Sequence, residues 1–180
     1  MRADLHIHSY YSDGLISPED IADMCVKNGV QLAALTDHDN MNGSSAFKEA
    51  CARRGIKCVR GIEISAYTDV KVHILGYNMD RHCEEYKKFD AFVKEGAMAR
   101  TADILAKLKK RGVSLGFDDV LRERKCSRSP VHTMYIARAA ARKGYAASPS
   151  SFYAEMLAPG RPAYSAAGRP SPEYALEVIK

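Results

Sequence analysis

The chain has 180 residues, of which 46% are hydrophobic and 27% are charged, with a formal net charge of +5. This length suits one domain, or one domain with a subdomain, and the composition excludes disordered and collagen-like proteins. No apolar run reaches the roughly 18 residues of a membrane span, and the first residues form no signal-peptide core, so the sequence predicts a soluble, cytoplasmic protein with no membrane partner.

The five cysteines are an odd number and include no Cys-x-x-Cys pair. This pattern argues against a disulfide framework and against a cysteine zinc site. We therefore expect reduced cysteines that pack in the protein interior.

The charge is divided along the chain. Residues 1–80 hold 8 basic and 11 acidic groups, whereas residues 87–180 hold 18 basic and 9 acidic groups. The acidic half, which carries four of the histidines, suits cations, and the basic half suits an anionic substrate or a phosphate backbone. Taken alone, the basic residues at 107–111 are better explained as the solvated face of a helix.

Predicted strands and helices alternate over the first 80 residues. Residues 3–8 alternate in a strand-like way, and a helix begins at Pro18, with Ser17 as its N-cap and Asp20 completing a capping box. There follow a buried strand at 31–36, a helix at 44–54 and strands at 57–65 and 70–77. This order predicts an α/β fold with a parallel sheet or barrel.

Helical signals alone follow residue 80. Stretches at 84–111 and 117–124 are predicted helices, and three later Ser-Pro pairs repeat the start seen at Ser17-Pro18, predicting helices at 130–143, 149–157 and 171–180. We expect three parts: the first part of the α/β body at 1–80, an all-helical insertion or lid at 81–165, and a return to the body at 166–180. The last predicted helix reaches Lys180 without a residue that ends it, so we expect the chain to be part of a longer protein.

Candidate metal ligands stand near the ends of the predicted strands. His6 and His8 are two residues apart on a strand, so both side chains leave the same face and can reach one metal cluster. That spacing alone is weak evidence, because some histidine pair shows it by accident in roughly one such sequence in six. The following loops and strands add four more candidates: Asp13, His38, Glu63 and His73.

Parallel strands bring their carboxyl ends to one face, where these side chains would meet. Imidazole and carboxylate ligands without thiolate favour zinc, manganese or iron. Taken singly, His73 among apolar neighbours is more often a packed histidine, and Asp13-Gly14 is an ordinary turn.

Four segments, DLHIHSYYSDG, LTDHDN, GIEIS and HILGY, resemble in order and spacing the first motifs of the polymerase and histidinol phosphatase (PHP) superfamily. They are similar to its stand-alone phosphoesterases, among them nucleoside 3′,5′-bisphosphate phosphatases that also act on the 5′ ends of RNA. The resemblance implies a distorted (βα)7 barrel, incomplete at the carboxyl end of this chain, with two or three divalent metals (Mn, Zn or Fe) at its mouth. The implied metal ligands are His6, His8, Asp13, His38, Glu63 and His73, with Glu63 bridging.

The chain departs from that superfamily in two places. The superfamily supplies three further ligands, one histidine and an Asp-x-His motif, beyond the point where this chain stops, so we expect a partial metal site. It also commonly carries Arg-Pro-His before an Ile-Ala-Arg-Ala helix, whereas this chain has Thr133-Met134-Tyr135 there. Arg128 and His132 lie upstream and are candidate phosphate contacts, with a helix-start charge and a packed histidine as the alternatives.

The implied activity is metal-dependent hydrolysis of phosphate esters by a metal-activated hydroxide, with no nucleophilic side chain. The expected substrates are small phosphorylated nucleotides or short RNA ends, and Asp37 and Asp39 would orient His38 or nearby water. Two alternatives stay open: a histidinol-phosphatase-like activity, and a non-catalytic module that binds metal or nucleic acid. No feature of the sequence indicates an oligomeric state.

Overall fold

The computed structural model describes residues 1–180, and the chain forms two compact units. Unit 1 comprises Met1–Asp90 and Pro170–Lys180, and unit 2 comprises Ala91–Arg169. The first turns of helix α3 (Glu84–Lys109) pack within unit 1, and the expected parts at 1–80, 81–165 and 166–180 stay predictions. The role of the helical part as an insertion or lid stays a prediction. No helix combines the length and the apolar character that crossing a membrane requires.

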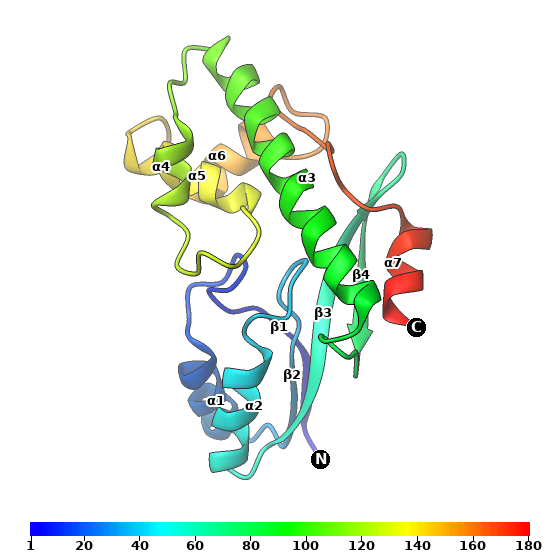
Figure 1. Ribbon diagram of the computed structural model, residues 1–180. Helices are drawn as coiled ribbons and strands as arrows, with labels where there is room; N and C mark the ends of the chain where they lie inside the picture. Colours follow the sequence, from blue (N-terminus) through cyan, green and yellow to red (C-terminus); the bar gives the residue numbers. More distant parts are fainter. The chain divides into compact units, whose positions relative to one another are not determined.

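Unit 1 is built on a four-stranded sheet of order β1-β2-β3-β4 (Figure 1). Its strands are β1 (Ala3–Ile7), β2 (Leu32–Leu35), β3 (Lys57–Tyr67) and β4 (Lys71–Tyr77). The predicted parallel pairing is confirmed for β1, β2 and β3, but β4 runs antiparallel to β3. The reason is the short connection at 68–70, since a parallel return needs a crossover of a dozen residues or more.

Two helices connect the parallel strands and cover one face of the sheet, α1 (Pro18–Lys27) and α2 (Ser44–Arg53) (Figure 1). The N-cap prediction is confirmed, because the Ser17 side chain accepts the backbone N–H of Asp20 at 3.0 Å. The Ser17 hydroxyl also donates to the Asp20 carboxylate at 2.6 Å, which ties the first helical turn together.

The core beneath the sheet is apolar and tightly packed. Phe47 from α2 is fully buried among residues of α1, β2 and the following strand, including Ile21 and Leu35. Burying one such side chain contributes roughly 1.5–3 kcal/mol. This core fixes the strand ends from which the candidate ligands project.

The start of α3 and helix α7 (Pro172–Ile179) complete unit 1. The Tyr86 hydroxyl accepts the backbone N–H of Met41 at 2.9 Å, and the rings of Phe89 and Tyr174 lie 6.2 Å apart. Helix α7 packs against β3 and β4, beside the latter strand in Figure 1. The chain therefore returns to unit 1 after unit 2.

Unit 2 contains only helical elements besides its loops. They are the rest of α3, α4 (Phe117–Leu121), α5 (Thr133–Arg142), α6 (Pro149–Phe152) and the π-helix η1 (Tyr153–Leu157). Its core consists of apolar side chains of these helices, Leu108, Tyr135 and Phe152 among them. Helix α3 approaches the returning chain so closely that a Cβ on Gly96 would lie 2.1 Å from the Gly168 carbonyl oxygen, so no larger residue fits there.

The predicted helix start at Ser129-Pro130 is wrong. Helix α5 begins at Thr133, and His132 is its N-cap, with Nδ1 accepting the backbone N–H of Met134 at 3.4 Å. Ser129 instead belongs to a turn, since its backbone N–H donates to the Cys126 carbonyl at 3.2 Å. A side chain other than serine thus caps this helix.

The two units differ in charge. Unit 1 carries 12 basic and 16 acidic residues, and unit 2 carries 15 basic and 6 acidic residues. The net charges are therefore −4 and +9. All five cysteines are free thiols; Cys25 and Cys51 are buried, whereas Cys58, Cys83 and Cys126 are only partly buried.

Candidate metal centre

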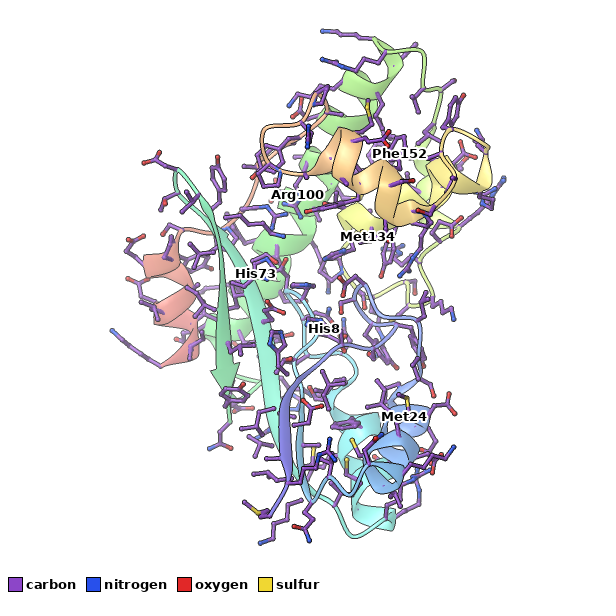
Figure 2. All side chains as sticks on the ribbon, turned by 180° about the vertical axis from the view of Figure 1, so that it is seen from behind. His8, Met24, His73, Arg100, Met134 and Phe152 are labelled. Atoms are coloured by element: carbon purple, nitrogen blue, oxygen red, sulfur yellow. The ribbon has the colours of Figure 1, made fainter.

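Four imidazoles form a continuous row across the sheet of unit 1. The ring centroids lie 5.1 Å apart for His6 and His8, 4.6 Å for His8 and His38, and 5.0 Å for His38 and His73. His6 and His8 come from the end of β1, His38 from the loop after β2, and His73 from β4. His8 and His73 are labelled in Figure 2. They belong to the same row of imidazoles although β1 and β4 are the two edge strands of the sheet.

The carboxylate of Glu63 lies at the middle of this row. Its Oε2 is 2.8 Å from Nε2 of both His6 and His8 and 3.6 Å from Nδ1 of His38, and its Oε1 contacts Nδ1 of His73. Glu63 is only 2% exposed. Burial by itself raises the pKa of this carboxyl, but the contacts with the four imidazoles outweigh burial and hold the pKa well below its usual range. Glu63 is therefore an ionised, buried acceptor.

Asp13 supplies a second carboxylate. Its Oδ1 lies 3.5 Å from Nδ1 of His8, and its Oδ2 lies 3.8 Å from Nε2 of His38. The loop that carries Asp13 folds back on the end of β1, since a Cβ on Gly14 would lie 2.7 Å from the His8 carbonyl oxygen. Glycine at position 14 therefore allows the close approach that places Asp13 beside the histidines.

The structure brings all six predicted ligands together in three overlapping groups. Within each group the candidate donor atoms lie within 4.8 Å of one another. The groups are His6, His8 and Glu63; His8, Asp13 and His38; and His38, Glu63 and His73. Because the groups share His8, His38 and Glu63, the arrangement suits neighbouring cations with common ligands.

The protonation of His38 fits divalent metal binding. Burial lowers the pKa of His38 to about 4, against the opposite effect of Asp13, Asp39 and Glu63, so its imidazole is neutral at pH 7 and able to coordinate. Burial also lowers the pKa of His8, but its hydrogen bond to Glu63 and the charge of Asp13 raise it further than burial lowers it. Nitrogen and oxygen donors of this kind suit divalent metals.

Asp37 acts on the loop after β1. Its carboxylate accepts three hydrogen bonds, from the Ser9 backbone N–H at 2.8 Å, the Ser9 hydroxyl at 2.7 Å and the Ser12 hydroxyl at 2.6 Å. Burial raises the pKa of Asp37, and these serine contacts partly offset that rise. Asp37 therefore holds the segment from which His8 and Asp13 project.

Asp39 acts on the opposite side of the site. Its Oδ1 accepts the backbone N–H of Ser65 at 2.7 Å, and the Ser65 hydroxyl lies 3.2 Å from Nδ1 of His38. Asp39 adopts a left-handed conformation with φ of 56°, and a parallel bridge joins the neighbouring His38 to Glu63. Asp39 thus holds Ser65, whose hydroxyl lies beside the His38 ring.

Four buried polar residues support the site although the sequence did not point to them: Ser9, Ser12, Asn40 and Ser65. Asn40 donates to the carbonyl oxygens of His38 at 2.8 Å and Tyr11 at 3.1 Å, which joins two ligand-bearing loops. The available signal was the run of polar residues inside HSYYSDG, between the ligands His8 and Asp13. Arg128 and His132 belong to unit 2, where Arg128 is exposed and His132 caps α5.

Two curated relatives align with most of the chain. It is 31% identical over 163 residues to a 3′,5′-nucleoside bisphosphate phosphatase of Chromobacterium violaceum, covering 89% of this chain and 56% of that protein. It is 30% identical over 179 residues to the 5′-3′ exoribonuclease Rnm of Salmonella typhimurium, covering 98% of this chain and 60% of that protein. The chain therefore spans somewhat more than half the length of these relatives.

Solved structures share the fold. An amidohydrolase from Chromobacterium violaceum with bound sulfate superposes with a TM-score of 0.87 at 29% identity, covering 99% of this chain and 63% of that one. A candidate metal-dependent phosphoesterase from Bifidobacterium adolescentis gives a TM-score of 0.89 at 26% identity, with the same coverage of 99% and 63%. Residues 4–124, which carry all six clustered side chains, match the PHP domain, and the chain belongs to this family.

Proposed function

We propose that this protein is a metal-dependent phosphoesterase whose divalent cations, two or three in number, are held by the six clustered side chains of unit 1. The observation that carries the proposal is the buried, ionised Glu63 in contact with four imidazoles, with Asp13 beside His8 and His38. Glu63 lies where it can bridge two cations, because both of its oxygens face imidazoles.

The bound cations supply charge for phosphate oxygens and lower the pKa of water, which is the chemistry of phosphoester hydrolysis. Other residues of the chain position the side chains that would bind the cations. Asp37 fixes the loop of His8 and Asp13, and the Ser65 hydroxyl at Nδ1 of His38 orients that ring so that Nε2 faces Asp13. The hydroxyls of Ser9 and Ser12 donate to Asp37, and the proposal gives neither a nucleophilic role.

Small phosphorylated nucleotides and short RNA ends are the proposed substrates. The curated relatives are named for a nucleoside bisphosphate and for RNA, and the net charge of +9 on unit 2 suits phosphorylated ligands. Arg128 and His132 stay the proposed phosphate contacts from the sequence. The same basic charge also favours the second candidate, a metal- and nucleic-acid-binding module without turnover.

Metal analysis and phosphate release together test the proposal. The purified protein is treated with a chelator, reloaded with manganese, zinc or ferrous iron, and assayed on adenosine 3′,5′-bisphosphate, a 5′-phosphorylated RNA oligonucleotide and histidinol phosphate. We expect bound metal and phosphate release from the nucleotide or the RNA. Release from histidinol phosphate alone would contradict the substrate class, metal binding without release would favour the module, and absence of bound metal would contradict both.

A further inference from the structure

Unit 2 contains a basic pocket of about 230 Å³. It is lined by Lys94 and Met98 of α3 and by residues of the segment that precedes α5. Three of the lining side chains are cationic, namely those of Lys94, Arg124 and Arg128. None of the lining residues is acidic. A concave site with this lining favours an anion.

The segment that forms one side of the pocket is fixed by its own hydrogen bonds. Arg124 Nη1 donates to the Ser129 carbonyl at 3.2 Å, and Ser129 donates its backbone N–H to the Cys126 carbonyl at 3.2 Å. Ser129 is buried and Ser127 is exposed, and both belong to the lining. The pocket therefore combines cations with hydroxyl groups on a shaped turn.

The electrostatics of this turn favour negative charge. Burial raises the pKa of the Cys126 thiol, but hydrogen bonds from Arg128 and Ser129 lower it below its usual value. The positive charge of unit 2 as a whole acts in the same direction. Both the local hydrogen-bond donors and the positive charge of unit 2 would stabilise an anion in the pocket.

The size of the pocket restricts the ligand. Pockets for drug-sized molecules measure about 300–1,000 Å³, so this one suits a small group rather than a whole nucleotide. Guanidinium groups match phosphate oxygens with paired N–H donors, and an ammonium group adds a point charge. We propose that this pocket binds a phosphate group through Lys94, Arg124 and Arg128.

Two sources of that phosphate share this chemistry, inorganic phosphate and the phosphate of a nucleotide. The second source would make the pocket a specificity element of the hydrolysis, and that part rests on the proposed function. Binding itself depends on neither metal nor turnover. It is therefore measured on chelator-treated protein, by calorimetric titration with inorganic phosphate, adenosine 5′-monophosphate and adenosine.

The variant Lys94→Gln removes one charge from the pocket, and Lys109→Gln is its control, because Lys109 is exposed on the same helix outside the lining. We expect the dissociation constant for inorganic phosphate to rise about tenfold in Lys94→Gln, as for loss of one charge-assisted hydrogen bond. We expect little change in Lys109→Gln and in the charge-conserving Lys94→Arg. Arg124→Gln serves as a second variant, with circular dichroism confirming that each protein is folded.

The adenosine 5′-monophosphate arm identifies the source. Binding of this nucleotide that weakens in Lys94→Gln, with no binding of adenosine, assigns the pocket to a nucleotide phosphate. Binding of inorganic phosphate alone assigns it to the free ion. Unchanged phosphate affinity in both folded pocket variants, or equal weakening in Lys109→Gln, would overturn the proposal, whether or not the protein hydrolyses phosphate esters.

Discussion

The two units place their carboxylates differently. Unit 1 buries Asp37, Asp39 and Glu63 close to the histidine row, each with polar contacts. Unit 2 buries no carboxylate, and three of its acids form ion pairs with basic side chains near the surface: Asp103 with Lys107, Asp119 with Lys143 and Glu123 with Arg142. Buried charge organises a site in unit 1, whereas apolar packing organises unit 2. Charge substitutions should therefore change metal binding strongly in the first unit and change the folding stability of the second unit only slightly.

The largest expected effect is that of Glu63→Gln. The substitution removes the charge that faces four imidazoles, so we expect metal affinity to fall more than about 100-fold, beyond what loss of a supporting residue costs. Phosphate release should fall to background with it. Metal content by plasma mass spectrometry and a phosphate assay measure both effects. The control is Glu49→Gln, an exposed residue of α2, and metal content equal to that of this control would contradict the ligand assignment.

The next largest effect is expected for Asp37→Asn. This variant separates residues that bind the metal from residues that only hold the ligands in position. The amide keeps the shape but loses one acceptor for the hydroxyls of Ser9 and Ser12. We expect metal affinity to fall by about 10- to 100-fold, less than for Glu63→Gln. A metal titration measures the change, with Asp69→Asn in the exposed turn after β3 as the control. Equal affinities for the two variants would rule out a supporting role for Asp37.

In unit 2, packing should matter more than charge, and Gly96→Ala tests this. The added methyl group would meet the Gly168 backbone, so we expect a loss of about 1–3 kcal/mol in the free energy of unfolding. Helix propensity alone would instead stabilise the variant by about 1 kcal/mol. Urea unfolding distinguishes the two signs. The reverse change Ala99→Gly, at an exposed position of α3, calibrates the propensity effect, and a more stable Gly96→Ala variant would refute the close contact.

The smallest expected effect is that of Lys143→Ala. Lys143 Nζ lies 2.6 Å from Asp119 and holds the pKa of that carboxyl below its usual value, but the lysine side chain is 37% exposed. We expect a loss in unfolding free energy smaller than that for Gly96→Ala, shrinking further at 1 M salt. Urea unfolding of this variant and of Lys110→Ala checks the value. A loss as large as that for Gly96→Ala would show that charge matters as much as packing for the stability of unit 2, and would contradict the proposed difference between the units.

Local signals made much of the fold predictable from the sequence. The N-cap at Ser17 and the apolar strand at 31–36 correspond to α1 and β2, because capping and burial leave marks on neighbouring residues. The start of α5 was missed since Ser129-Pro130 resembles a cap while tertiary contacts hold it in a turn. The antiparallel direction of β4 follows from the three-residue connection, a signal that the strand pattern alone does not express.

The sequence predicted which residues form the candidate site, but not how they contact one another. Spacing and strand position identified the six side chains that the structure brings together, and their role as ligands stays a prediction. The central place of Glu63 depends on the pairing of β3 with both of its neighbours. The hydrogen bonds of Asp37 join residues 25 and 28 positions apart, and no local pattern specifies such contacts.

The hairpin of β3 and β4 carries Glu63 and His73 only ten residues apart. Closing so short a loop costs little entropy, and hairpins form in microseconds, so this pair can meet before longer closures bring His8 and His38 to it. Cations present at that stage would encounter two donors instead of six. We expect the yield of correctly filled centres after refolding to depend on whether the cation is added before or after the chain has folded.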